Sequence, residues 1–230
     1  MAITIVASVL GTAAGGNNVT LALNSTAIDD IVVTWGGFAG GTATAPGVIS
    51  PTGYASVWVN DSAALDTKLE WKRLTAADPS VLLANSGDVA DAVGYVAYVL
   101  RGVVPTGSPF QGGTQTSIAT GVPNVPSIVT VTANAMVLAL GANDILDATP
   151  GVLDRFSANI GGSTNDTDDL SVGGAASIIA VAGSTYASVW TTWGSGVYNT
   201  VAVALTPASV VAGVVDTSLT GFLASMGAGA

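Results

Sequence analysis

The 230-residue sequence predicts an all-β protein that forms an antiparallel β-sandwich with short terminal arms. Short runs rich in β-branched residues recur along the chain, and Gly, Pro, Asn, Asp and Ser separate them. No strong helical period accompanies these runs, and such spacing is typical of sandwiches and barrels. The pentapeptide Tyr-Ala-Ser-Val-Trp occurs at Tyr54–Trp58 and again at Tyr186–Trp190. Its aromatic rings alternate with Ala and Val, as a half-buried strand requires.

The predicted strands follow from β-branched or alternating segments that lie between turn-forming residues. The first segment is predicted as a strand and not as a leader, because no cation precedes it and Thr4 and Ser8 interrupt its short apolar run. In chain order, the predicted strands are Ile3–Leu10, Val19–Asn24, Ile31–Trp35, Tyr54–Asn60, Lys68–Leu74, Val93–Arg101, Ile128–Thr132, Ala135–Leu140, Phe156–Ile160, Ala176–Ala182, Tyr186–Trp193 and Tyr198–Thr206.

The residue patterns of two predicted strands indicate whether their faces are solvated or buried. In the run from Lys68 to Lys72 the charged side chains take one face, which we expect to be solvated, while Leu69 and Trp71 take the other. In Val93–Arg101 both faces are apolar. Such a strand is either central in its sheet or covered by another subunit.

The chain divides into three predicted regions. Residues 1–16 form an N-terminal strand and arm, residues 17–207 a single β-sandwich domain, and residues 208–230 a C-terminal arm or short helix. Within the domain, residues 102–126 contain several Pro and Gly residues and are predicted as a long loop. A tandem duplication, with this loop as its divide, is the alternative organisation.

Composition excludes several classes of function. The formal net charge is −10 and there are 5 Lys and Arg residues, so no basic stripe is available for nucleic acid or for an anionic membrane surface. No apolar run approaches the roughly 18 residues that span a bilayer. Charged residues make up 9% of the chain, against about 25% in ordinary soluble proteins. This scarcity indicates either a surface covered by neighbours or a tolerated surface of small polar residues.

Catalysis is not expected. The chain has no His and no Cys, so Ser-His-Asp triads, imidazole acid–base chemistry and thiol nucleophiles are impossible. A Ser-Lys pair would need Lys68 or Lys72, and neither has a Ser three residues before it. The pairs Asp29-Asp30 and Asn60-Asp61 lie at predicted strand ends, where Asx-turns are the ordinary explanation.

An acidic loop is the candidate metal site. Asp166, Asp168 and Asp169 follow a Gly-Gly-Ser turn, and alternating carboxylates of this kind can direct oxygen ligands to Ca²⁺. The spacing matches no EF-hand, and a solvated polar turn is the alternative. No other cofactor is expected.

Aromatic residues are the candidate carbohydrate contacts. Trp35, Trp193 and Tyr198 could form a platform on which a sugar ring stacks. Packing of these rings between two sheets is the ordinary explanation.

Several segments resemble virion proteins of tailed bacteriophages. The resemblance rests on Asp30–Phe38, on Tyr54–Asn60 with the charged Trp-bearing strand after it, on Val93–Gly102 and on the closing Tyr198–Pro207. It is a likeness of strand order and texture over roughly residues 19–207, without a diagnostic motif. The resemblance implies a jelly-roll sandwich that is attached to a phage head or tail as an oligomer, a trimer being favoured.

The resulting functional hypothesis is a non-enzymatic virion protein that is assembled in the host cytoplasm. A head decoration or cement component is favoured, followed by a tail-associated component, and its expected partners are copies of itself and the major capsid or tail protein. A carbohydrate-binding adhesin module is the alternative. The expected contact residues lie near the two termini and are Ile3, Ile5, Val210, Val211, Val214, Leu219 and Phe222.

Overall fold

The structure is a computed structural model of the chain. It describes residues 2–14, 18–40, 47–50, 52–60, 62, 64–77, 80–84, 92–145, 156–164, 169–190 and 193–209. All regular structure in these residues is β-strand, and every paired strand is antiparallel, which confirms the predicted antiparallel β-sandwich class. The strands are β1 (Thr4–Ala13), β2 (Val19–Ala22), β3 (Ile31–Ala39), β4 (Gly47–Ser50), β5 (Ala55–Asn60), β6 (Leu65–Arg73), β7 (Ser80–Ala84), β8 (Ala92–Arg101), β9 (Phe110–Gly121), β10 (Asn124–Val129), β11 (Ala135–Asn143), β12 (Ser157–Thr164), β13 (Leu170–Ile179), β14 (Thr185–Val189) and β15 (Gly196–Leu205).

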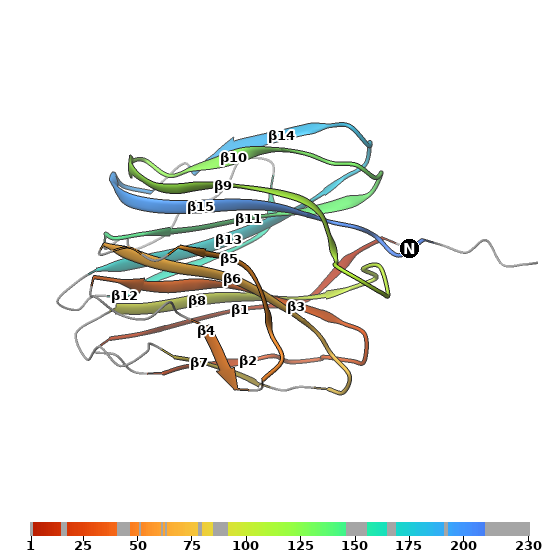
Figure 1. The fold of residues 1–230 in the computed structure, drawn as a ribbon, viewed down its shortest axis with the longest axis horizontal. Helices are drawn as coiled ribbons and strands as arrows, with labels where there is room; N and C mark the ends of the chain where they lie inside the picture. Colours follow the sequence, from red (N-terminus) through yellow and green to blue (C-terminus); the bar gives the residue numbers. More distant parts are fainter. Residues whose placement is uncertain are drawn as a thin grey trace, which may run out of the picture.

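The strands form four stacked layers (Figure 1). The two middle layers are five-stranded sheets with the orders β1-β8-β3-β6-β5 and β12-β13-β11-β15-β9. The three-stranded sheet β2-β7-β4 covers the outer face of the first, and the pair β10-β14 covers the outer face of the second. The predicted sandwich therefore has four sheets, not two.

The two halves of the chain repeat one arrangement. In the first half β3 pairs with β8 and β6, and Ile31 lies opposite Leu100 and Arg73. In the second half β11 pairs with β15 and β13, and Met136 lies opposite Leu205 and Ile178. Each residue of the second set stands 105 positions after its counterpart in the first. The register therefore relates β3, β6 and β8 to β11, β13 and β15 by a constant offset of 105 residues, while the outer and edge strands correspond by strand order with local shifts in register.

The two copies of the pentapeptide Tyr-Ala-Ser-Val-Trp do not occupy equivalent positions in the two halves. Its first copy runs into β5, an edge strand of a five-stranded sheet, and its second copy overlaps β14 in the outer pair. By strand order, the counterpart of β5 is β12 and the counterpart of β14 is β7. The two copies are therefore similar strands in different places, and the halves correspond through register.

The prediction of a long loop over residues 102–126 is wrong, because β9 and the start of β10 lie there. The prolines that suggested a loop occupy positions that strands tolerate. Pro105 and Pro109 precede β9 and Pro123 lies between the strands. Pro126 lies inside β10 where the pairing with β14 shifts register, so no ladder hydrogen bond is lost at that residue.

The main hydrophobic core lies between the two five-stranded sheets. Alternate residues of β3, β8, β11 and β15 face into it, including Val33, Trp35 and Leu138. One buried polar contact crosses this core, where the Asn199 amide donates a hydrogen bond to the Thr67 hydroxyl. Two further cores lie between each middle sheet and its outer sheet. Strand β8 is central and buried on both faces, which confirms one of the two surroundings predicted for it.

The charged face of β6 is covered, so the predicted solvation of this face is wrong. Lys68 Nζ lies 2.9 Å from Glu70 Oε1, and the Glu70 side chain is almost fully buried. The backbone N–H of Val48 in β4 donates to Glu70 Oε2 at 2.8 Å. The carboxylate is buried because it has both a cation and a backbone donor.

Tyr98 makes stability depend on alkaline pH. Burial in the main core raises the pKa of its hydroxyl above the usual value of about 10. Below pH 10 the Tyr98 hydroxyl is protonated in both states, so its contribution to the free energy of unfolding does not change with pH. As pH rises from the pKa of the unfolded chain toward that of the folded protein, this free energy falls by roughly 1 kcal/mol per pH unit. Denaturant unfolding on both sides of pH 10 is expected to show this decline, and Tyr98→Phe is expected to weaken it. Equal pH dependence in both proteins would contradict the assignment.

Candidate functional site

Both termini of the described chain and the loops that join the halves meet at one end of the sandwich, here called the termini end (Figure 1). Val104 N donates to Thr206 O, Thr206 N donates to Pro109 O, and Ala208 N donates to Gly102 O. These backbone hydrogen bonds hold the last described residues against the segment that joins β8 to β9. The first described residues, the segment that connects the two halves and the last described residues therefore all lie at the termini end.

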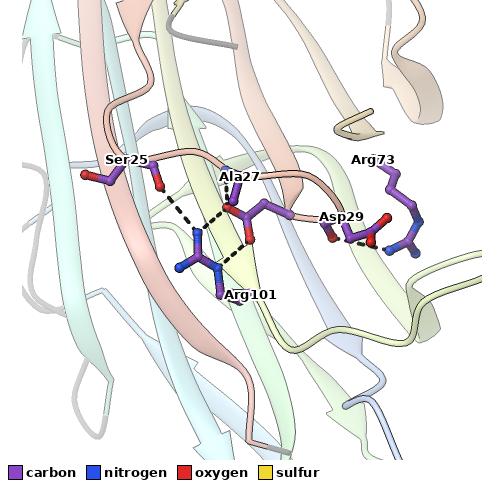
Figure 2. A network of polar contacts seen from close by, with 6 residues as sticks. Ser25, Ala27, Asp29, Arg73 and Arg101 are labelled. Carbon is purple, nitrogen blue, oxygen red and sulfur yellow. Dashed lines mark hydrogen bonds and ion pairs between the residues drawn. The ribbon is translucent and has the colours of Figure 1, made fainter. Parts of the chain in front are cut away.

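In the first half, an ion pair orders the loop between β2 and β3 at this end (Figure 2). Arg101 Nε and one terminal nitrogen each lie 2.8 Å from an oxygen of Asp30, whose side chain is buried. Asp30 also accepts the Ala27 N–H at 2.8 Å. The hydrogen bond and charge of Asp30 raise the pKa of the Arg101 guanidinium. Because all its contacts are to loop groups, this pair has a structural role.

The second half orders the corresponding loop with a neutral residue. Gln111 Oε1 accepts the backbone N–H groups of Val131 and Thr132, each at 2.7 Å. Its Nε2 donates to Thr132 Oγ1 at 3.0 Å and to Leu205 O at 3.1 Å. One amide thus satisfies two backbone donors in the β10–β11 loop and links it to β15.

Gln111→Ala is expected to lower the free energy of unfolding by about 1–3 kcal/mol, because it leaves these two backbone donors without their acceptor. Hydrogen exchange should accelerate at the Val131 and Thr132 amides while the β3 amides stay protected. Gln115→Ala, on the same strand, is the comparison variant. Unchanged exchange at Val131 and Thr132 would contradict this role.

Three exposed aliphatic side chains lie on or beside this loop. Val129 ends β10, Val131 follows in the loop, and Val181 lies in the β13–β14 turn. Their exposed fractions run from 51% for Val129 to 68% for Val131. We call these three residues the apolar rim. Ile178 is exposed too, but it shares the main-core face of β13 with Ala176, and Ile28, Val59 and Val122 lie on other elements.

Hydrogen bonds of Thr130 fix the backbone of the apolar rim. Thr130 N donates to Ser184 O, and Gly183 N donates to Thr130 O at 2.7 Å. The Thr130 hydroxyl donates to Val181 O at 3.3 Å. These contacts tie the β10–β11 loop to the β13–β14 turn, so the valines are presented on a joined, ordered backbone.

The apolar rim differs from the same positions of the first half. The residues 105 positions earlier are Asn24, Thr26 and Ala76, which are polar or small. The wider surroundings differ likewise, because no charged residue occurs from Gly102 to Asn143 or from Leu170 to Val215. Since charge is depleted at the cores of protein interfaces, the uncharged surface of the second half is the candidate contact surface.

Two hollows lie at this end of the second half. An open recess of about 490 Å³ lies at the termini end, between Thr132–Asn134 on one side and Ala2 with Thr206–Ser209 on the other. A shallower hollow of about 310 Å³ is lined by Ile178–Val181 and Ser184–Ala187. Val181 of the apolar rim lines the second hollow, and Val131 directly precedes the residues that line the first.

The proposed carbohydrate contacts are not at the surface. Trp35 lies in the main core, and Trp193 and Tyr198 are buried on the outer side of their sheet. Trp193 packs against Trp190 with ring centroids 4.6 Å apart. Sugar stacking needs an accessible ring face, and these side chains offer none.

The proposed metal ligands are only partly within the described chain. Asp166 and Asp168 lie outside the described residues, and Asp169 is half-buried just before β13. Among the residues that the structure describes, no three carboxylates gather into a group that could hold a metal ion.

The predicted contact residues fall into two sets. Ile3 is buried in the main core and Ile5 packs against it, so the N-terminal segment is used within its own sheet. The others lie outside the described residues and are Val210, Val211, Val214, Leu219 and Phe222. The apolar rim was not predicted, although the uncharged stretches around it are visible in the sequence.

Comparison with known proteins finds no family model, no curated protein and no solved structure that matches this chain. The resemblance to phage virion proteins therefore stays a prediction. In the described part of the chain, no helix has the length and apolar character needed to cross a membrane.

Proposed function

We propose that this chain is a non-enzymatic structural protein of a tailed-phage virion, in the first place a head decoration component. The apolar rim carries the proposal, because it is an ordered, uncharged and exposed surface on one half of an otherwise repeated fold. Burial of such a surface against a neighbouring virion protein would stabilise a particle without chemistry. A tail-associated position is the second candidate, and the same surface would serve it.

The strand order supports the jelly-roll part of this proposal. In the first half, β1-β8-β3-β6 lies over β2-β7-β4. In the second half, β9-β15-β11-β13 lies over β10-β14. Strands distant in sequence are neighbours in each sheet, as Greek-key connections require, and double-sheet jelly rolls occur in viral capsid domains. Strand β5 departs from a simple two-sheet pattern because it pairs with β6.

Fractionation of the native source lysate tests the proposal. Particles are separated on a density gradient, and the particle and free-protein fractions are analysed by quantitative mass spectrometry. We expect this chain in the particle fraction in a fixed ratio to a capsid or tail protein. Its presence only among free proteins, with intact particles in the same gradient, would overturn the proposal.

A further inference from the structure

We infer that the C-terminal segment Val210–Leu223 of one copy binds the apolar rim of a second copy. The inference deepens the proposed function, because it rests on the apolar rim as a contact surface and names the partner that covers it. The partner is another copy of this chain, and the binding groups are aliphatic and aromatic side chains. Copies joined in this way form a closed oligomer when the rotation between neighbouring copies closes a ring.

The composition of the segment matches the apolar rim. From Val210 to Ala230 the only charged residue is Asp216. A segment with so few charges is compatible with an uncharged surface, since no desolvated charge is left unpaired there. The apolar side chains available for the contact are Val210, Val211, Val214, Val215, Leu219, Phe222 and Leu223.

The place where the described chain ends favours a second copy over the same copy. Pro207 forms a bridge with Val103, and the strand direction there is antiparallel. Residues 206–208 therefore run toward Gly102 and Ala2, which lies beside Gly102. No residue of the apolar rim lines the recess that Thr206–Ser209 help to form. The last described residues therefore lie against Gly102 and Ala2 and not against their own apolar rim.

The length of the segment permits the crossing. Residues 210–230 span up to about 70 Å when extended, at roughly 3.3–3.6 Å per residue. Because Ser209 and Asn134 line the same recess, the point of departure and the apolar rim share the termini end. Copies that meet at this end bring each segment close to the apolar rim of its neighbour.

Site-specific disulfide formation tests the inference, since the natural chain contains no Cys. One protein carries Val181→Cys and a second carries Val214→Cys, and the purified full-length proteins are mixed and oxidised with a copper–phenanthroline catalyst and air. The control replaces the first with Ala76→Cys, 105 positions before residue 181. We expect mixed disulfide dimers with Val181→Cys, at several times the yield of the control. Equal yields would overturn the inference.

The double variant Val181→Cys/Val214→Cys distinguishes the two sources of the segment. We expect linked copies on a non-reducing gel, whereas a disulfide within single copies would overturn the inference in favour of the chain's own apolar rim. Deletion of residues 210–230 is further expected to lower the native oligomeric mass while the fold is kept, and an unchanged mass would count against exchange. These measurements use purified protein, so they can fail while the chain is still found in particles.

Discussion

Trp35→Ala is expected to lower the free energy of unfolding by about 3–5 kcal/mol, which is the range for removing a large buried aromatic side chain. Trp35 is 2% exposed and lies in the main core between the two five-stranded sheets. Its loss leaves a cavity between the halves, which the surrounding strands cannot close without distorting two ladders. Urea unfolding followed by circular dichroism measures the change.

Trp35→Phe is the matched comparison for this variant. It keeps an aromatic ring in the core and removes an indole N–H that has no hydrogen-bond partner among the described residues. We expect a much smaller loss than with alanine. If Trp35→Ala kept the stability of the natural chain, the ring would not be a core residue, and a surface role for it would return.

Gly37→Ala is expected to cost about 3 kcal/mol, near the upper end of the usual range for overpacking. Gly37 lies in β3 opposite Thr67, and a Cβ at this position would overlap the backbone carbonyl of Asp66. A backbone atom in a central sheet cannot move aside as a flexible side chain can. The measurement is again the free energy of unfolding.

Gly112→Ala controls for the general effect of replacing a strand glycine. It lies in β9, and a Cβ there would have no atom within 4 Å. We expect its stability to stay close to that of the natural chain. Equal losses at the two positions would show that lost backbone freedom, and not the close approach of β3 and β6, determines the effect.

Strands with clear apolar patterns could be predicted from sequence. A repeat of the two halves was foreseen only as the alternative of a tandem duplication, and its register could not be predicted. The runs at Val93–Arg101 and Ala135–Leu140 are strongly apolar, and both are buried strands. The repeat is a repeat of register: Trp35 in β3 corresponds to Leu140 in β11, so position and burial are kept while the residue changes. Strand β9 escaped prediction because the prolines and glycines around it outweighed its Thr-rich alternation.

The candidate site was less accessible to sequence reasoning. Val131 and Val181 are 50 positions apart, and hydrogen bonds of Thr130 bring their segments together. The aromatic residues suggested a binding platform because residue type does not reveal burial. The low content of charged residues indicated a surface that neighbours could cover. The absence of charge from long stretches of the second half indicated more specifically where this surface lies. The uneven charge distribution could be interpreted only after each residue of the second half was compared with the residue 105 positions earlier in the first half.

Attachment through the apolar rim to neighbouring proteins of the particle is the proposed function of this chain. Val129→Lys/Val181→Lys places two charges on the apolar rim, and Asn24→Lys/Ala76→Lys places two charges at the corresponding exposed positions of the first half. Each full-length variant is produced in cells that assemble the particles, and its content in gradient-purified particles is measured. We expect the first variant to fall at least tenfold while the second stays near the natural level, with both thermally stable. Equal content of the two variants in the particles would contradict attachment through the apolar rim.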